Sequence, residues 1–237
     1  MENYSTESFV KGLEQLNIEL SENQIQQFLK YYEMLVEWNK VMNLTAVREK
    51  NEVARRHMAD SLFLLKCADL KGKKILDIGT GPGFPGMPLK LYDPTLDITM
   101  LDSTSKRIAF IEESAAQLGV SVKTMAARAE EVAPKMMGKF DIVTSRAVAA
   151  LDVLTELSMA FVKVGGYFMP MKSCNEASQE ELDKAKHAIE FMGGKLIGTR
   201  EYSVEEGVMR QVLIIEKVRH SPKGYPRKYA AISKKPL

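Results

Sequence analysis

The sequence predicts an α/β fold, a seven-stranded doubly wound sheet whose last strand is antiparallel, preceded by an N-terminal helical cap. Three observations support this fold class. From Lys74 onward, short apolar runs alternate with segments of helical length, which is typical of a parallel sheet with crossover helices. The first run stops in alternating glycines, as expected for a tight turn after a buried strand. Only residues 203–207 separate the last two runs, and because so short a link cannot hold a crossover helix, those two strands pair antiparallel.

The chain of 237 residues divides into three predicted parts. Residues 1–70 form the helical cap, residues 71–218 the sheet domain and residues 219–237 a basic tail. This length suits one α/β domain with appendages. The N-terminus is polar, and no apolar run reaches the roughly 18 residues of a membrane span. We therefore expect a cytoplasmic protein with no signal peptide and no membrane contact.

Apolar residues at helical spacing predict the helices of the cap. A short helix is expected over residues 5–16. Ser21 is a suitable N-cap for a longer helix that ends near Val41. A third helix is expected over 49–67. Because these helices are amphipathic, each should pack against a neighbour.

The sheet domain is predicted from the alternation of apolar strands with longer helical segments. The strands are expected at 74–78, 96–102, 121–126, 140–145, 166–171, 195–202 and 208–218. The helices are expected near 86–92, 104–118, 150–163 and 176–192.

The glycine-rich turn after the first strand predicts a nucleotide-like binding site. Glycine at positions 79, 81 and 83 lets the backbone take positive φ and lets a ligand approach the main chain. Asp102 ends the second strand, where an acid can accept hydrogen bonds from ribose hydroxyls. The alternative for Asp102 is an ordinary acid in a solvated loop. An adenosine-containing cofactor is therefore indicated.

Two cofactors share this geometry, a dinucleotide such as NAD and S-adenosylmethionine. The residues from Gly81 to Gly86 satisfy the dinucleotide spacing G-x-G-x-x-G, so spacing alone does not choose between them. A pyrophosphate needs backbone N–H donors at the turn, and Pro82 and Pro85 each remove one. Read from Asp77, the pattern D-x-G-x-G-x-G resembles motif I of the Rossmann-like methyltransferases. We therefore favour S-adenosylmethionine and keep an NAD oxidoreductase as an alternative.

Other pocket residues should follow the carboxyl ends of the first four strands. Phe84 would cover the bound nucleoside, or would simply pack. Ala129 and Glu130 would bond the adenine edge, although Glu130 with Glu131 can instead be a charge pair in a first helical turn. Arg146 should point into the pocket mouth, where it would bind the cofactor carboxylate or an RNA phosphate. Arg146 is therefore our candidate catalytic residue.

The residues after the fourth strand limit which kinds of atom can accept the methyl group. Enzymes that methylate exocyclic amines usually have Asn or Asp and two prolines there, whereas this chain has Ser145-Arg146-Ala147-Val148. Methylation of cytosine carbon 5 needs a thiolate, and Cys174 lacks the accompanying Pro-Cys pair. The two cysteines and three histidines are scattered, so neither a disulfide nor a metal site is expected. What remains is an atom that is already nucleophilic, such as guanine N7, which needs placement rather than a base.

Further motifs accompany the glycine turn. They are Trp38-Asn39-Lys40-Val41-Met42-Asn43-Leu44-Thr45, Arg56-His57-Met58-Ala59-Asp60-Ser61, Asp102-Ser103 with Lys106-Arg107, Ser145-Arg146-Ala147-Val148, Tyr225-Pro226-Arg227-Lys228 and Ser233-Lys234-Lys235-Pro236-Leu237. With them the chain resembles, over nearly its whole length, the RsmG (GidB) methyltransferases. These enzymes transfer methyl from S-adenosylmethionine to N7 of a guanine in the 16S rRNA of the bacterial small ribosomal subunit.

The resemblance implies a Rossmann-like class I S-adenosylmethionine-dependent methyltransferase fold. It also implies S-adenosyl-L-methionine as cofactor and 16S rRNA or the small ribosomal subunit as partner, with no metal. Together with the motif I reading, it places cofactor contacts at Asp77, Gly79, Gly81, Gly83, Phe84, Asp102, Ala129, Glu130 and Arg146.

The charge pattern agrees with an RNA partner. Residues 217–237 hold seven of the 33 basic residues and no acid, although the whole chain has a net charge of only +2. Tyr225 and Tyr229 are interleaved, which suits looped RNA, where aromatic rings stack on bases. The alternative is a disordered, solubilising tail. We expect RNA contacts at Arg56, Lys106, Arg107, Arg227, Lys228, Lys234 and Lys235.

The chain departs from the family at one point, and several alternative functions remain open. The family usually has glycine and proline where this chain has Tyr229-Ala230-Ala231-Ile232, so the tail departs from the family pattern at this point. A methyltransferase acting on a small molecule or a protein would not need the tail. A binding module that senses S-adenosylmethionine without transferring methyl is a further alternative.

Overall fold

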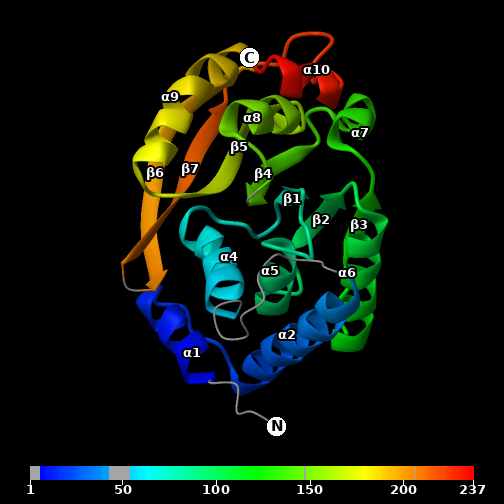
Figure 1. Cartoon of the computed structure of the whole chain (residues 1–237), viewed down its shortest axis with the longest axis vertical. Coiled ribbons are helices and arrows are strands. Elements are labelled where there is room, and N and C mark those ends of the chain that lie inside the picture. The colour runs from blue at the N-terminus through cyan, green and yellow to red at the C-terminus, as the bar shows by residue number, and fades with distance from the viewer. Residues whose placement is uncertain (1–5, 43–53, 147, 206) are drawn as a thin grey trace.

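The computed structural model describes residues 6–42, 54–146, 148–205 and 207–237, and their side chains over 9–40, 57–146, 148–204 and 207–237. Its centre is one seven-stranded sheet with the strand order β3-β2-β1-β4-β5-β7-β6 (Figure 1). The strands are β1 (Lys74–Ile78), β2 (Asp97–Asp102), β3 (Lys123–Ala126), β4 (Phe140–Arg146), β5 (Val162–Ser173), β6 (Gly194–Glu205) and β7 (Val208–Lys217).

The strand directions are those predicted from the sequence. The pairs β1–β2, β1–β4, β2–β3 and β4–β5 are parallel. Strand β7 is antiparallel to both of its neighbours, β5 and β6. The order reverses at β1, which lies between β2 and β4. In open α/β sheets such a reversal opens a crevice at the carboxyl ends of the strands, where ligands bind.

Helices cover both faces of the sheet. One face carries α1 (Thr6–Gln15), α2 (Glu22–Met42), η1 (Ala54–Ala59), α4 (Asp60–Leu62), η2 (Phe63–Lys66), α5 (Gly86–Tyr92) and α6 (Ser105–Leu118). The other carries α7 (Ala129–Met136), α8 (Leu151–Met159), α9 (Glu176–Phe191) and α10 (Tyr229–Lys234).

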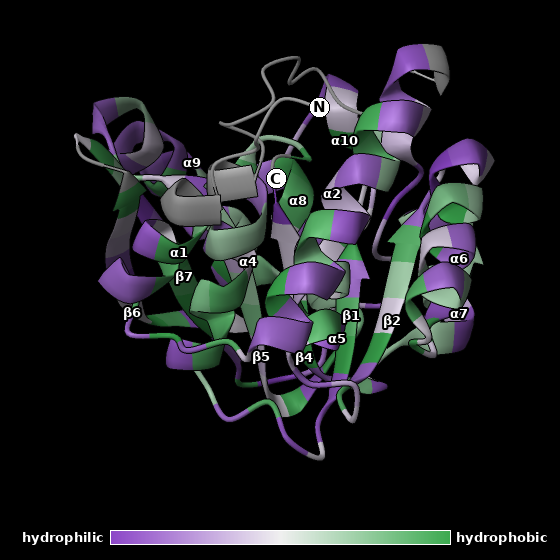
Figure 2. Ribbon diagram, turned by 90° about the horizontal axis from the view of Figure 1, so that it is seen from below, coloured by the Kyte–Doolittle hydropathy of each residue, from purple (hydrophilic) through white to green (hydrophobic). Residues whose placement is uncertain are grey.

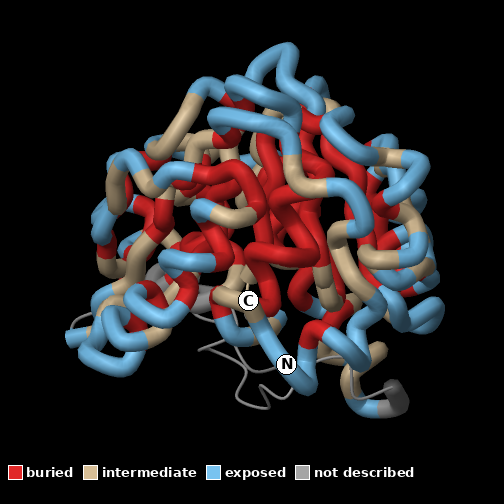
Figure 3. The backbone as a smooth tube through the Cα atoms, turned by 90° about the horizontal axis from the view of Figure 1, so that it is seen from above, coloured by how far each residue is buried: buried red, intermediate tan, exposed pale blue. Residues whose placement is uncertain are grey.

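Consecutive residues of β1 explain the two hydrophobic cores. Ile75 packs in the core beneath the helical cap, and Leu76 packs in the core beneath α8 and α9. Successive side chains of a strand point to opposite faces, so a continuous apolar run feeds both cores. Figure 2 shows the apolar residues gathered on the central strands, and Figure 3 shows that these strands are buried while the outer helix faces are exposed. None of the helices described combines the length and the apolar character needed to cross a membrane.

Ser21 caps helix α2, as predicted from the sequence. The Ser21 hydroxyl accepts from the Gln24 amide at 3.3 Å, and the Ser21 amide donates to Gln24 Oε1 at 2.8 Å. This reciprocal pair is a capping box, which fixes the start of α2. Phe28, Tyr31 and Leu35 then lie fully buried on one side of α2. The cap therefore packs on the sheet domain rather than standing apart from it.

The predicted third helix is not regular. Its described part, 54–66, passes from a π turn (η1) through one α turn (α4) to a 3-10 turn (η2), and residues 49–53 of the predicted helix lie outside the described part of the chain. Apolar spacing alone cannot distinguish these three hydrogen-bonding patterns. Such π segments occur frequently at functional sites.

The second face differs from the prediction at one helix end and in two helices that the sequence did not predict. Helix α8 ends at Met159 and β5 begins at Val162, because the apolar run there is buried in either conformation and its period is ambiguous. Helix α7 was not among the predicted helices, although Glu130 and Glu131 were interpreted as a possible charge pair in a first helical turn. Helix α10 was not predicted either, and the tail that carries it is folded against α8.

Candidate active site

The turn between β1 and α5 is held together from within by Asp77. Its carboxylate is fully buried and accepts from Thr80 Oγ1 at 2.6 Å and from the Gly86 amide at 3.0 Å. Burial raises the pKa of Asp77 to about 6, against the lowering effect of these hydrogen bonds. Asp77 was predicted as a cofactor contact; in the structure its carboxylate organises the turn and is not part of the pocket wall.

The three predicted glycines of the turn all have positive φ, at 65°, 59° and 96°. A Cβ on Gly79 would lie 2.5 Å from Val148, and one on Gly83 would lie 2.7 Å from the Tyr31 hydroxyl. A Cβ on Gly81 would meet none of the described atoms within 4 Å. Gly79 and Gly83 are therefore required by packing as well as by φ, whereas Gly81 borders open space that a ligand can occupy.

Asp102 joins the end of β2 to the glycine turn. Only 4% exposed, it accepts from the Gly81 amide at 3.0 Å and from the Thr104 amide at 2.8 Å. Arg107 Nη1 lies 3.3 Å from the same carboxylate. The alternative of an ordinary solvated acid is therefore wrong, because Asp102 is buried and fixes the position of the turn.

A pocket of about 440 Å³ lies beside this turn, at the carboxyl ends of β1, β2 and β3. Its acidic side chains are Asp102 and Glu130, and its apolar walls include Leu101, Val148 and Leu157. This volume lies within the range of about 300 to 1,000 Å³ that is usual for small-molecule sites. The acids and the apolar walls fit the adenosine part of S-adenosylmethionine.

The residues after β3 line this pocket as predicted. Ala129 and Glu130 both contribute to its wall. Glu130 Oε1 also lies 3.7 Å from Arg128 Nη1, and Glu131 begins α7 with it. The two interpretations of Glu130 are therefore compatible, because a first-turn acid at this edge also faces the pocket.

Arg146 lies elsewhere than the sequence predicted. It is not part of the wall of the pocket beside the glycine turn. Instead its guanidinium donates to the His57 carbonyl at 3.1 Å and lies 4.0 Å from the Asp60 carboxylate. The physical reason is that the irregular segment η1–α4 folds over the end of β4 and supplies these partners, which sequence spacing does not reveal.

Arg146 borders a smaller cavity of about 130 Å³ at the ends of β4 and β5. Asp60, Tyr202 and Arg210 also line it, and Arg210 Nε lies 3.1 Å from the Asp60 carboxylate. Burial lowers the pKa of Arg146, while the Asp60 charge acts in the opposite direction. Two guanidinium groups thus lie around one buried carboxylate in the wall of this cavity.

Phe84 packs in the protein interior and is not part of the pocket wall. It is 3% exposed, and its ring centroid lies 5.8 Å from that of Tyr31 and 5.1 Å from that of His57. The Arg146 guanidinium lies 4.9 Å from the same ring. Of the two interpretations given to Phe84, packing is therefore the one that the structure supports.

The tail contributes a pocket residue that sequence reasoning missed. Tyr229 lines the larger pocket, and the Arg128 guanidinium lies 5.5 Å from the centre of its ring. The available signal was the spacing of Tyr229 and Ile232, which lie three residues apart at the start of a helix. The other tail aromatic, Tyr225, packs against Phe191 of α9 at 5.0 Å, so its predicted stacking on RNA is not supported.

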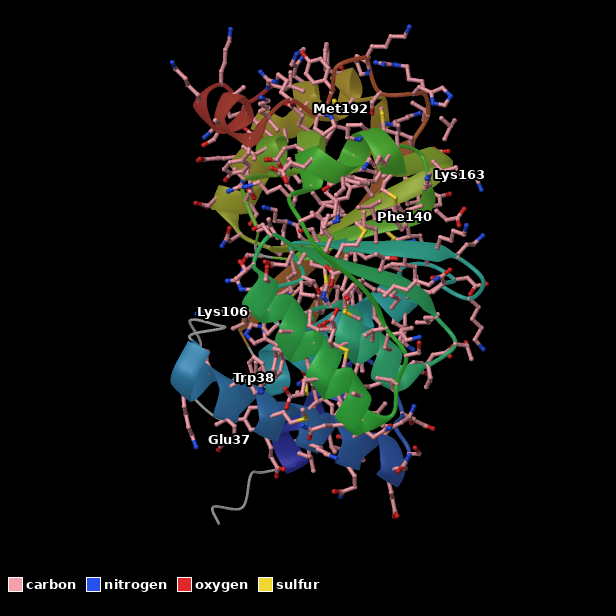
Figure 4. All side chains as sticks on the ribbon, turned by 90° about the vertical axis from the view of Figure 1, so that its right-hand side faces the viewer. Glu37, Trp38, Lys106, Phe140, Lys163 and Met192 are labelled. Atoms are coloured by element: carbon pink, nitrogen blue, oxygen red, sulfur yellow. The ribbon has the colours of Figure 1, made fainter. Side chains whose placement is uncertain are left out.

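The predicted RNA-binding residues separate into two groups. Arg227 is bound to the buried Glu156, and Arg107 is bound to Asp102, so neither is a freely available surface cation. Four lysines are exposed on the carboxyl side of the sheet or on the tail, and Figure 4 shows one of them, Lys106, on the same side of the molecule as α10. The side chain of Arg56 lies outside the described residues. The exposed lysines are Lys106, Lys228, Lys234 and Lys235.

Neither a thiol nucleophile nor a metal site is found near the pocket within the described residues. Burial raises the pKa of the Cys174 thiol, and Cys174 is not part of the wall of either cavity. No cluster of three or more His, Cys, Asp or Glu residues suited to a metal occurs there either. These features do not assist thiolate chemistry.

Comparison with known proteins adds a family to this geometry. The family model GidB, described as rRNA small subunit methyltransferase G, matches residues 24–207. A curated relative from Lachnoclostridium phytofermentans, named ribosomal RNA small subunit methyltransferase G, is 45% identical over 235 residues, covering 97% of this chain and 96% of that protein. A relative of the same name from Clostridium novyi is 43% identical over 229 residues, covering 94% of this chain and 93% of that protein.

The fold is also found among solved structures. TYW2 of M. jannaschii in complex with AdoMet superposes with a TM-score of 0.56 and 15% identity, covering 73% of this chain and 78% of that one. The arrangement is that of the class I S-adenosylmethionine-dependent methyltransferases, as predicted from the sequence.

Proposed function

Because the chain belongs to the GidB family of methyltransferases, we propose that it transfers methyl from S-adenosylmethionine to N7 of a guanine in the 16S rRNA of the small ribosomal subunit. The observation that carries the proposal is the pocket at the carboxyl ends of β1–β3, beside a glycine turn with open space at Gly81. With this substrate the site of action is the cytoplasm, where ribosomes are assembled.

The pocket residues divide the binding of the cofactor among them. Asp102 lies at the end of β2, where it would meet the ribose hydroxyls while it holds the turn through the Gly81 amide. Ala129 and Glu130 would meet the adenine edge. Gly79 and Gly81 would let the methionine part pass close to the main chain. When bound, the cofactor supplies an electrophilic methyl group on a sulfonium.

The chemistry asks little of side chains beyond placement. Guanine N7 carries a lone pair in the ring plane and no proton, so its attack needs no general base. This agrees with the pocket acids, because Asp102 is already engaged by Gly81, Thr104 and Arg107. Orientation of two reactants can supply roughly 7 to 11 kcal/mol of a barrier in favourable cases.

Arg146 keeps a proposed role next to the reaction. It borders the smaller cavity on the same edge of the sheet as the cofactor pocket, and it is fixed by the His57 carbonyl and the Asp60 carboxylate. From there we assign it to contacts with the cofactor carboxylate or with an RNA phosphate, after movement of the side chain. Arginine suits both, since its fork binds such anions bidentately.

The exposed lysines provide a surface for RNA. Lys106 lies in the first turn of α6 at the carboxyl edge, and Lys228 precedes α10. Lys234 and Lys235 end the same tail helix. In A-form RNA the groove that holds N7 is too narrow for side chains, so the target guanine is expected in a loop or displaced from its stack.

The test is transfer of labelled methyl from S-adenosylmethionine to small ribosomal subunits that lack the modification, followed by nucleoside analysis of the RNA. Label in 7-methylguanosine is the expected result. Label in another nucleoside would contradict the assignment to N7. If the protein binds the cofactor but no label enters the RNA, the methyl acceptor would instead be a small molecule or a protein, or the protein would sense the cofactor without transferring methyl.

A further inference from the structure

The cofactor pocket has apolar surface that the protein itself leaves uncovered. Val148 and Tyr229 are large apolar residues that are 39% and 40% exposed, and both line this pocket. Tyr229 comes from the C-terminal tail, whereas the glycine turn, Asp102 and Glu130 come from the sheet domain. A planar ligand in the pocket would cover this surface.

The position of Tyr229 is set by an apolar anchor on the same short helix. Ile232 is fully buried and packs against Val153 and Leu157 of α8, with Ala129 packed against this cluster. Leu157 and Ala129 are also part of the pocket wall. The anchor of α10 and the wall of the pocket thus share residues, so the helix that carries Tyr229 is attached to the pocket wall.

A buried ion pair fixes the approach of the tail. Glu156 of α8 is fully buried and accepts from the Arg227 amide at 2.9 Å, from Arg227 Nε at 2.9 Å and from Nη2 at 2.5 Å. The same Nη2 donates to the Lys235 carbonyl at 3.1 Å. One guanidinium therefore holds both ends of α10, which begins at Tyr229.

We propose that Tyr229 is a cofactor-binding residue of this chain, whose ring packs on the adenine of S-adenosylmethionine. The adenine is indicated because Tyr229 contacts Arg128, which directly precedes the proposed adenine contacts Ala129 and Glu130. The proposed ribose contact, Asp102, lies at the end of β2. Arg128, at 5.5 Å from the ring centre, restricts its orientation. This inference rests on the proposed cofactor site and extends it to the tail.

The test measures cofactor affinity without RNA. Dissociation constants for S-adenosylhomocysteine and for adenosine are determined by calorimetry for the wild type, Tyr229→Ala, Tyr229→Phe and the tail control Lys223→Ala. Loss of base stacking predicts about tenfold weaker binding of both ligands to Tyr229→Ala. Tyr229→Phe and Lys223→Ala should bind as the wild type does. Because the ring is 40% exposed, the ligand-free Tyr229→Ala protein should unfold near the wild-type temperature.

A second readout follows the tail itself. If the ligand contacts Tyr229, binding must stabilise the docked tail, so S-adenosylhomocysteine should slow trypsin cleavage after Lys228 in the wild type and in Tyr229→Phe, but not in Tyr229→Ala. Equal dissociation constants for the wild type and Tyr229→Ala would overturn the inference, as would a loss for S-adenosylhomocysteine without one for adenosine. If the wild type binds neither ligand, the proposed cofactor site itself fails.

Discussion

The carboxylate of Asp102 connects two loops that together shape the cofactor pocket. It accepts from Gly81 on one side and from Thr104 on the other. Asp102→Ala would release both loops and remove the group expected at the ribose. We expect binding of S-adenosylhomocysteine to weaken about tenfold or more, since hydrogen bonds to a charged group are strong.

The control for Asp102 lies in the same strand. Asp97 begins β2 and pairs with Lys123 at 2.5 Å on the surface, so Asp97→Ala should leave the affinity unchanged. Calorimetry of both variants separates a local effect at the pocket from a general weakening of β2. Equal affinity in the wild type and Asp102→Ala would remove Asp102 from the site.

At this scale the sequence revealed some residues and not others. The positive φ of the glycines and the place of Asp102 at the end of β2 were predicted correctly, because strand ends and backbone freedom are local properties. The direction of the Arg146 side chain was not predicted, because its partners His57 and Asp60 lie far from it in the sequence. His57 precedes Arg146 by 89 residues. The ion pair of Arg227 was not predicted for the same reason, since its partner Glu156 lies 71 residues away in the sequence.

Asp77 makes the stability of the protein depend on pH in an unusual direction. Its pKa in the folded protein, about 6, lies above the ordinary value of 3.8. The folded state therefore holds this proton more tightly than the unfolded state does, so its stabilising contribution is complete below about pH 4 and is lost as the pH rises to about 6. Two pKa units correspond to about 3 kcal/mol.

The measurement is the unfolding temperature of the wild type and Asp77→Asn between about pH 4 and 7. Because all other groups are shared, the difference between the two curves isolates Asp77. The wild type should lose stability relative to the variant as the pH rises. Parallel curves would show that Asp77 titrates normally.

Helix α10 depends on a contact rather than on its own helical propensity. It has six residues, which is too short to be stable alone. Arg227 holds it to the buried carboxylate of Glu156. Sequence patterning missed this helix because the tail is polar and short, and because only its Ile232 is fully buried. The same limit applied to α7, whereas the long helices α2, α6 and α9 were found by their apolar period.

This arrangement predicts different outcomes for two neighbouring basic residues. Arg227→Ala would leave Glu156 buried and unpaired, and we expect a loss of about 2 to 4 kcal/mol in the free energy of unfolding, toward the lower end because Arg227 is partly exposed. Lys228→Ala changes an exposed side chain and should cost less than about 0.5 kcal/mol. Urea unfolding of both variants provides the comparison. Equal small losses would mean that the ion pair does not hold the tail.

The whole molecule presents two cavities on one edge of the sheet. The larger lies over β1–β3 with Asp102 and Glu130, and the smaller over β4 and β5 with Arg146 and Asp60. The observed strand order explains why ligands are expected at this edge, because the order reverses at β1 and the crevice opens at the carboxyl ends of the strands. Tail and cap both close over it, which no local pattern could show.

The exposed lysines on this edge should determine how binding of the RNA depends on salt. Each phosphate contact contributes about 0.7 to 0.9 to the slope of log affinity against log salt. Replacing Lys106, Lys228 and Lys234 together by glutamine should therefore lower the slope by about two and weaken binding of small ribosomal subunits. Affinity for S-adenosylhomocysteine should stay unchanged, since none of the three lines the cofactor pocket.

The matched control makes the same charge change at the opposite edge. Lys73 precedes β1, Lys139 precedes β4 and Lys163 lies at the start of β5, and Figure 4 shows Lys163 on the side away from Lys106 and α10. All three are exposed. Filter binding across a salt series then compares two proteins of equal net charge. A slope that is reduced only in the variant of Lys106, Lys228 and Lys234 locates the RNA at the carboxyl edge. Equal reductions in both triple variants would mean that only net charge matters, and the carboxyl edge would then not be the RNA surface.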